Sequence, residues 1–152
     1  MGKTILITGA TDGVGKATAE LLANNRHEII IHARSRSKGE RIEGEIRKKT
    51  GNEKVTCIVA DFTGLSEISG MVSDIKMKFS KIDVLINNAG VYRMKKNMLP
   101  NGLEETFMVN HLAHFYLTLK LLPLLKPCQF SQHTNRFGRV FHIVNTNNGR
   151  AI

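Results

Sequence analysis

The chain has 152 residues, which is the length of one ordinary domain. Hydrophobic residues make up 41% of it and charged residues 23%, a composition that excludes a disordered chain. Lysine and arginine (22) outnumber aspartate and glutamate (13), so the formal net charge is +9. This excess favours an anionic partner but does not choose among a nucleotide, a nucleic acid and an acidic lipid.

Cysteine content and hydropathy bear on the cellular compartment of the protein and on whether it spans a membrane. Two cysteines, Cys57 and Cys128, cannot form a disulfide scaffold and lack metal-ligand spacing, so we expect a reduced compartment, the cytoplasm. Residues 1–9 lack the long apolar core and cleavage site of a signal peptide. The most apolar later stretch, residues 115–125, is interrupted by a lysine and a proline and is shorter than the roughly 20 residues that a bilayer needs. No membrane span is therefore expected.

Short apolar runs alternate with longer helical segments along the whole chain. The expected strands are Thr4–Thr8, Glu28–Ala33, Val55–Ala60, Val84–Asn87 and Arg139–Val144. The expected helices are Gly15–Asn25, Ser37–Thr50, Ser66–Phe79 and Leu103–Leu124. This alternation predicts an α/β fold: a Rossmann-type, doubly wound parallel sheet of about five strands with helices on both faces. No linker, repeat or low-complexity tract interrupts it, so residues 1–152 are expected to form a single domain.

A glycine-rich loop, Thr8–Gly15, joins the first strand to the first helix, where doubly wound folds bind phosphate groups. Gly9 permits a sharp exit from the strand, while Gly13 and Gly15 lack a Cβ and allow close backbone approach to a pyrophosphate. The helix N-terminus adds unpaired N–H groups and a positive dipole end. The alternative is a glycine-rich turn without a ligand. The spacing is neither G-x-G-x-x-G nor G-x-x-x-x-G-K-[ST], so phosphoryl transfer is not expected.

Two motifs in their expected positions resemble those of the short-chain dehydrogenase/reductase family: Thr-Gly-x-x-x-Gly-x-Gly at 8–15 and Asn-Asn-Ala-Gly at 87–90. Residues 83–90 and 104–115 are most similar to its retinol-dehydrogenase-like branch, and the resemblance extends to about Ile143. It implies an NAD(P)-binding oxidoreductase that transfers hydride between a nicotinamide and a small-molecule carbonyl or alcohol.

The residues expected to bind the cofactor lie in the glycine loop and after the later strands. They are Gly9, Thr11, Asp12, Gly13, Val14, Gly15, Arg34, Asp61, Phe62, Asn87, Ala89 and Gly90. The resemblance implies that Asp61 holds the adenine amino group; the alternative is an N-cap of the following helix, and both roles are compatible. The Asn-Asn-Ala-Gly segment could likewise serve only to brace the sheet.

The end of the second strand bears on the choice of dinucleotide. Ala33 stands where an NAD-selective site usually has an acidic residue, and Arg34 follows, with Arg36 and Lys38 nearby. A guanidinium can bind a 2′-phosphate with two hydrogen bonds, whereas a carboxylate would repel it. NADP(H) is therefore the preferred cofactor and NAD(H) the second choice; a solvated basic loop is the alternative. The absence of an acidic residue at the end of the second strand also argues against a Rossmann-like methyltransferase. No sequence motif supports nucleic-acid binding.

The catalytic residues are implied by the resemblance alone. An asparagine on the helix after Asn-Asn-Ala-Gly organises a water chain in this family, and Asn110 occupies its place. The alternative is a purely structural amide, which burial would require to be hydrogen-bonded. We interpret His111 and His114 as core or helix-surface residues, and no metal is expected.

The family's serine and Tyr-x-x-x-Lys pair follow the fifth strand, where the lysine lowers the pKa of the tyrosine general acid/base. Asn145 falls on the serine position. Tyr92 with Lys96, and Tyr116 with Lys120, match the spacing but lie before that strand. We therefore expect a C-terminally truncated domain that is inactive as this chain and has an exposed sheet edge available for pairing. The alternatives are a non-catalytic NADP(H)-binding module and a non-functional truncated product.

Overall fold

Four parallel strands form the sheet that organises the chain in the computed structural model, which describes residues 2–125, 133–134 and 140–141. The strands are β1 (Thr4–Ile7), β2 (Glu28–Ala33), β3 (Val55–Val59) and β4 (Val84–Ile86). Their spatial order is β3-β2-β1-β4. Leu6 of β1 lies opposite Ile30 of β2 and Leu85 of β4, which sets the register at the centre of the sheet.

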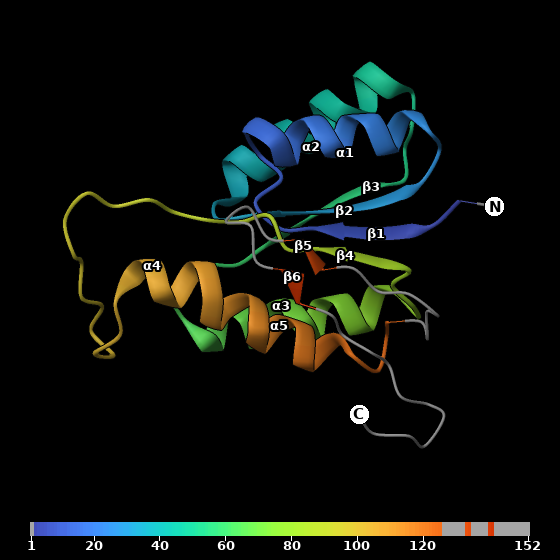
Figure 1. The fold of residues 1–152 in the computed structure, drawn as a ribbon. Coiled ribbons are helices and arrows are strands. Elements are labelled where there is room, and N and C mark those ends of the chain that lie inside the picture. The colour runs from blue at the N-terminus through green and yellow to red at the C-terminus, as the bar shows by residue number, and fades with distance from the viewer. Residues whose placement is uncertain (1, 126–132, 135–139, 142–152) are drawn as a thin grey trace.

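Helices cover both faces of this sheet, as predicted for a doubly wound fold (Figure 1). One layer contains α1 (Gly13–Asn24) and α2 (Arg36–Thr50). The other contains α3 (Leu65–Lys78) and α5 (Ala113–Leu121). Among the described residues, no helix combines the length and the hydrophobicity that a membrane span requires.

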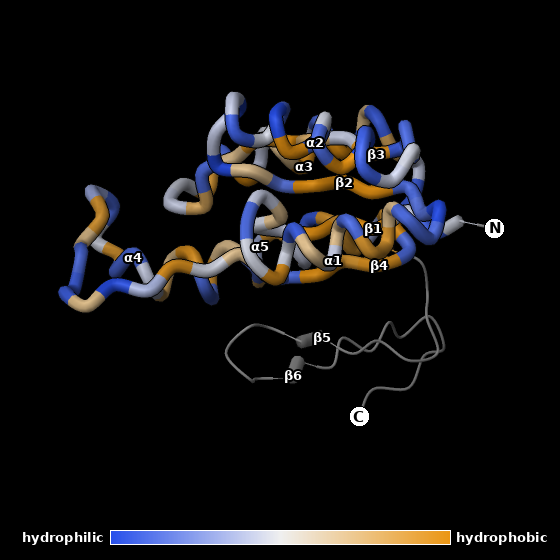
Figure 2. The backbone as a smooth tube through the Cα atoms, turned by 90° about the horizontal axis from the view of Figure 1, so that it is seen from above, coloured by the Kyte–Doolittle hydropathy of each residue, from blue (hydrophilic) through white to orange (hydrophobic). Residues whose placement is uncertain are grey.

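The strands are hydrophobic on both sides because each side packs against helices (Figure 2). Ile5 and Ile7 of β1 belong to the cluster under α1 and α2, whereas Leu6 between them belongs to the cluster under α3 and α5. All three are at most 3% exposed. Side chains on a strand alternate between faces, so one short apolar run supplies both halves of the core.

The expected helix Leu103–Leu124 has a more complex form. It consists of α4 (Glu105–Phe107), a π-helical turn η1 (Met108–Leu112) and α5, with the Ala113 N–H bonded to the Met108 carbonyl. Glu104 caps its start by accepting hydrogen bonds from Thr106 N (2.9 Å) and Phe107 N (2.8 Å). Hydrophobic pattern alone does not distinguish a π-turn from an α-turn, which is why the prediction missed it.

The expected fifth strand of the parallel sheet is not seen in the described residues. Val140–Phe141 (β6) pairs antiparallel with His133–Thr134 (β5), in a two-stranded sheet separate from β1–β4. The rest of the predicted strand lies outside the described residues. An antiparallel pair needs only a short connection, so a nearby segment can satisfy the backbone groups of these residues locally.

Candidate functional site

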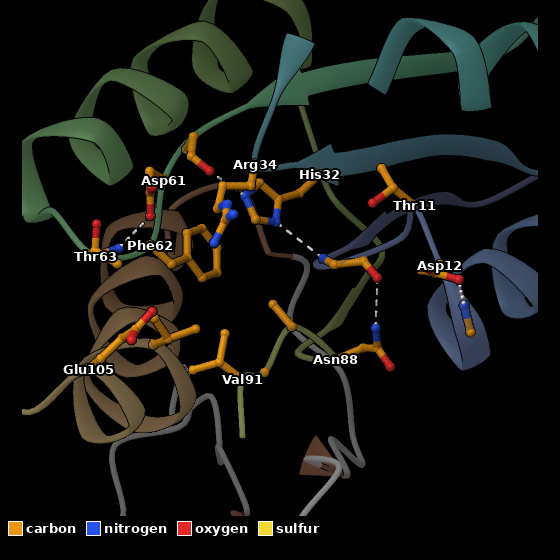
Figure 3. Close-up of a pocket in the computed structure, with 16 residues that line it drawn as sticks. Thr11, Asp12, His32, Arg34, Asp61, Phe62, Thr63, Asn88, Val91 and Glu105 are labelled. Atoms are coloured by element: carbon orange, nitrogen blue, oxygen red, sulfur yellow. Dashed lines mark hydrogen bonds between the residues drawn. The ribbon is translucent and has the colours of Figure 1, made fainter. Parts of the chain in front are cut away.

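A pocket of about 490 Å³ lies at the carboxyl ends of all four parallel strands. Strand order reverses here between β1 and β4, so the loops after neighbouring strands leave in different directions and open a crevice. The lining residues are Gly9, Thr11, Asp12, Gly13, His32, Arg34, Ala60, Asp61, Phe62, Thr63, Asn88, Ala89, Gly90, Val91, Glu105 and Val109. Figure 3 shows Thr11, Asp12 and Asn88 on one side and Arg34, Asp61 and Phe62 on the other. The volume suits a small-molecule ligand.

Two glycines, Gly9 in the loop after β1 and Gly15 in the first turn of α1, are required by packing against the loop after β4. A Cβ on Gly9 would lie 2.7 Å from the Cα of Ala89, and the φ of Gly9 is +62°. A Cβ on Gly15 would lie 2.4 Å from Asn88 Nδ2 and 2.5 Å from the Gly9 carbonyl oxygen. Gly13 differs, since a Cβ there would meet nothing within 4 Å. The backbone at Gly13 therefore borders open space.

The same two loops are joined by hydrogen bonds between Thr8 and Asn88. The Asn88 Nδ2 group donates to the carbonyls of Thr8 (2.9 Å) and Gly9 (3.0 Å). The Thr8 Oγ1 atom accepts from the backbone N–H groups of Asn88 (2.9 Å) and Ala89 (3.0 Å). Asn88 was not among the predicted site residues, although it stands inside the Asn-Asn-Ala-Gly motif.

Asp12 begins α1 by capping it, which places the start of the helix two residues before the predicted one. Its Oδ1 atom accepts from Gly13 N at 2.8 Å, and its Oδ2 atom lies 3.2 Å from Lys38 Nζ. The hydrogen bond from Lys38, followed by that from Gly13, lowers the pKa of the Asp12 carboxyl. Lys38 therefore offsets a negative charge at the edge of the pocket.

His32, near the end of β2, connects the loops after β1 and β3 and was missed by the sequence analysis. Its Nδ1 atom accepts from Gly9 N (3.1 Å), and its Nε2–H donates to the Ala60 carbonyl (2.9 Å). These two bonds define the neutral tautomer. The ring stacks on Phe62 with centroids 4.1 Å apart. Burial lowers the pKa of His32 to about 4. A polar residue inside the apolar strand Glu28–Ala33 was the signal that could have found it.

Asp61 and Phe62 occupy the turn after β3. The Asp61 Oδ1 atom accepts from Thr63 N at 2.9 Å, and the N-cap of α3 is Gly64. The alternative prediction that Asp61 caps the helix is therefore wrong: its carboxylate closes a turn before the helix begins. Phe62 is 3% exposed and lies between His32 and His114, whose ring meets it edge-on at 5.7 Å.

Arg34 differs in its ion pairing from the two other basic residues that follow β2, Arg36 and Lys38. Arg36 pairs with Glu40 and Lys38 with Asp12. Arg34 lines the pocket and makes no ion pair with the described residues. Its charge lies close enough to Glu105 to help lower the pKa of that carboxyl. Arg34 is thus the pocket cation left available for an anionic group.

Glu105 is a buried acid in the pocket wall that no local sequence pattern indicated. Arg93 binds it with two hydrogen bonds of 2.8 Å, and Asn97 Nδ2 donates a third of 2.8 Å. The bonds from Arg93 and then Asn97 lower the pKa of Glu105 to about 2. Its partners lie 8 and 12 residues away in a loop, so only the folded chain brings this group together.

Asn87 and Asn110 face the interior of the fold. Asn87 Nδ2 donates to Thr118 Oγ1 of α5 at 3.2 Å. Asn110 Oδ1 accepts from Val91 N (2.7 Å), and Asn110 Nδ2 donates to the Val91 carbonyl (2.8 Å). The Asn110 amide thus fixes the loop after β4, and its role in a water chain stays a prediction.

The structure brings most of the predicted site residues together. Those that line the pocket are Gly9, Thr11, Asp12, Gly13, Arg34, Asp61, Phe62, Ala89 and Gly90. Those that do not line it are Val14, Gly15, Asn87 and Asn110. Asn145 lies outside the described residues. No group of three or more potential metal-ligating side chains occurs within the described ranges.

The family of this chain follows from comparison of its sequence with known proteins. The family model for short chain dehydrogenases matches residues 3–147. The chain belongs to the short chain dehydrogenase family. Human polyprenol dehydrogenase is 37% identical over 134 residues, covering 88% of this chain and 41% of that protein. Human retinol dehydrogenase 13 is 41% identical over 125 residues, covering 82% and 38%. The chain therefore spans about two fifths of the length of these relatives. The predicted similarity to the retinol-dehydrogenase-like branch of the family is confirmed.

Solved structures of the same fold carry either dinucleotide. A 3-ketoacyl-(acyl-carrier-protein) reductase from Brucella melitensis complexed with NADH is 30% identical, with a TM-score of 0.67, and the match covers 81% of this chain and 50% of that one. A short-chain dehydrogenase from Sphingobium yanoikuyae in complex with NADPH is 28% identical, with a TM-score of 0.68 and coverages of 80% and 47%.

Replacing Gly15 tests the packing between the two loops. Gly15→Ala should destabilise the folded chain by about 1–3 kcal/mol, because the new Cβ must displace Asn88 or the Gly9 carbonyl. The matched control is Gly44→Ala in α2, where a Cβ meets nothing within 4 Å, and it should stabilise by about 0.5–1 kcal/mol. Urea unfolding of both variants measures the difference, and equal effects would contradict the packing argument.

The low pKa of His32 should make stability depend on pH. Unfolded histidine titrates near 6.5 and folded His32 near 4, so the unfolded chain takes up the proton first as pH falls. The stabilisation is complete above pH 6.5 and declines towards pH 4, by about 2 kcal/mol between pH 7 and pH 5.

Urea unfolding at both pH values measures this loss. His32→Phe should lower stability at pH 7 and flatten the dependence, whereas His111→Phe, which removes an exposed imidazole, controls for loss of one histidine. Parallel pH curves for the wild type and His32→Phe would exclude His32 as the titrating group.

Proposed function

We propose that this chain forms the NADP(H)-binding part of an oxidoreductase that interconverts a carbonyl and an alcohol by hydride transfer. The observation that carries the proposal is Arg34: it lines the pocket directly after β2, has no ion-pair partner among the described residues and follows Ala33 rather than an acid. A guanidinium in this position suits a 2′-phosphate, which distinguishes NADP(H) from NAD(H).

The remaining pocket residues suit the other parts of a dinucleotide. The open backbone at Gly13, at the N-terminus of α1, suits a pyrophosphate, because helix N-termini favour anions. Asp61 and Phe62 form a polar and an apolar wall that suit the adenine ring. Ala89 and Gly90, in the loop after β4, border the same crevice. The bound cofactor would supply the hydride, and the chain would hold and orient it.

Charge compensation in the pocket supports the same ligand. Three carboxylates line the pocket: Lys38 and Arg93 pair with those of Asp12 and Glu105, whereas Asp61 makes no ion pair with the described residues. These pairs reduce the repulsion that a phosphate would otherwise meet from two carboxylates. NADH stays the second candidate, since its complex with a 30% identical relative shows that the fold also accepts it.

Arg34→Asp tests the choice of cofactor. The variant should bind NADPH at least about tenfold more weakly, through loss of a charge-assisted contact and repulsion of the 2′-phosphate, while NADH binding changes little. Arg36→Asp has the same charge change two residues away, outside the pocket lining, and should leave both affinities nearly unchanged. Titration of cofactor fluorescence gives all affinities. Equal loss of NADPH and NADH in Arg34→Asp would reject the assignment.

The two tyrosines of the chain do not suit the role of proton donor. Tyr92 is 80% exposed. Tyr116 shares a hydrogen bond of 2.9 Å with Ser69, and Lys120 Nζ lies 5.3 Å from the centre of its ring. Neither lines the described pocket. We therefore extend the proposal: these 152 residues by themselves bind NADP(H) without turning it over.

Kinetics of the purified 152-residue polypeptide test this extension. NADPH should bind, yet its absorbance at 340 nm should stay constant when retinal or a medium-chain aldehyde is added, because no tyrosine borders the pocket. If slow NADPH oxidation is seen, the Tyr92→Phe and Tyr116→Phe variants test whether either tyrosine is its proton donor. Turnover lost in either variant would assign that tyrosine a catalytic role and overturn the extension, while leaving cofactor binding intact.

A further inference from the structure

The loop between β4 and α4 projects beyond the two helix layers in both views (Figures 1 and 2). Its base is fixed by the Asn110 amide, which holds both backbone groups of Val91. Glu105 fixes it further by binding Arg93 and Asn97. The segment 92–98, here called the basic loop, is therefore held in a defined position.

The exposed side chains of the basic loop are apolar and cationic. Tyr92 is 80% exposed, Met94 is 92% exposed and Met98 is 52% exposed. Lys95 and Lys96 lie between the two methionines, are exposed and form no ion pair with the described residues. No acidic residue occurs from 91 to 103. Large apolar side chains are thus presented to solvent next to uncompensated positive charge.

From this combination we propose that the basic loop docks the protein on an anionic lipid surface. Methionine and tyrosine side chains can enter the headgroup region, while adjacent lysines bind lipid phosphates. The net charge of +9 attracts the whole chain towards such a surface. A loop of seven residues is too small for a stable protein interface, which uses about 20–30 residues on each side. Insertion of a projecting tip needs no such area.

The proposal predicts binding to anionic but not to zwitterionic vesicles. The 152-residue chain should co-sediment with phosphatidylcholine vesicles containing 30% phosphatidylserine, much less with phosphatidylcholine alone, and less at high salt. Lys95→Glu combined with Lys96→Glu should weaken binding at least about tenfold. Lys48→Glu combined with Lys54→Glu changes the net charge equally at exposed positions outside the loop and is the matched control.

A fluorescent probe reports whether the loop enters the lipid. The chain contains no tryptophan, so Met94→Trp places a single reporter at the most exposed apolar position of the loop. Its emission should shift to the blue with anionic vesicles and be quenched by lipids carrying a nitroxide in the acyl chain.

Three results would overturn the proposal. One is absence of wild-type binding to anionic vesicles. Another is equal loss of binding in the two double variants, which would mean that net charge alone acts. The third is an unchanged Met94→Trp spectrum on bound vesicles, which would reassign the exposed tip to a protein partner. None of these measurements depends on cofactor binding.

Discussion

The pocket depends on close contact between the loops after β1 and β4. Space for a Cβ is absent at Gly9, which faces Ala89, and at Gly15, which faces Asn88. Backbone polar groups at so tight a crossing are partly buried, and leaving them unpaired would cost free energy. Asn88 satisfies two carbonyls, and Thr8 Oγ1 satisfies two N–H groups. Packing and hydrogen bonding thus fix the same crossing.

His32 extends this arrangement to β2, in which it lies, and to the loop after β3. It accepts a hydrogen bond from Gly9, donates one to Ala60 and stacks on Phe62, so three strand ends share one neutral ring. Because burial makes its protonation unfavourable, the ring carries no charge that would compete with Arg34 at the pocket. The cationic character of this wall therefore comes from Arg34 itself.

Ion pairing divides the basic residues into structural and available groups. Lys38 and Arg93 are committed to Asp12 and Glu105, and both pairs hold parts of the pocket wall. Arg34 at the pocket and the lysines of the basic loop have no such partners in the described chain. Among the exposed cations without an ion pair in the described chain, Arg34 lines the pocket and Lys95 and Lys96 stand on the projecting loop, and these are the ones on which the two proposals rest.

The sequence by itself determined the doubly wound sheet, the position of the glycine loop and most of the pocket residues. Apolar periodicity and glycine spacing are local properties, so residues such as Gly9 and Arg34 could be placed from them, whereas Asp61, Ala89 and Gly90 were predicted from the resemblance to the family. Tertiary structure alone decided the π-turn at Asn110, the roles of His32 and Glu105 and the pairing of Val140–Phe141. The roles of His32 and Glu105 and the pairing of Val140–Phe141 depend on hydrogen-bond partners from other segments of the folded chain, and the π-turn lets Asn110 in it bind Val91 in the loop after β4. Asp61 illustrates the difference. The sequence Asp-Phe-Thr-Gly at 61–64 is typical of a helix N-cap, but in the folded chain the Asp61 carboxylate closes a turn before the helix begins.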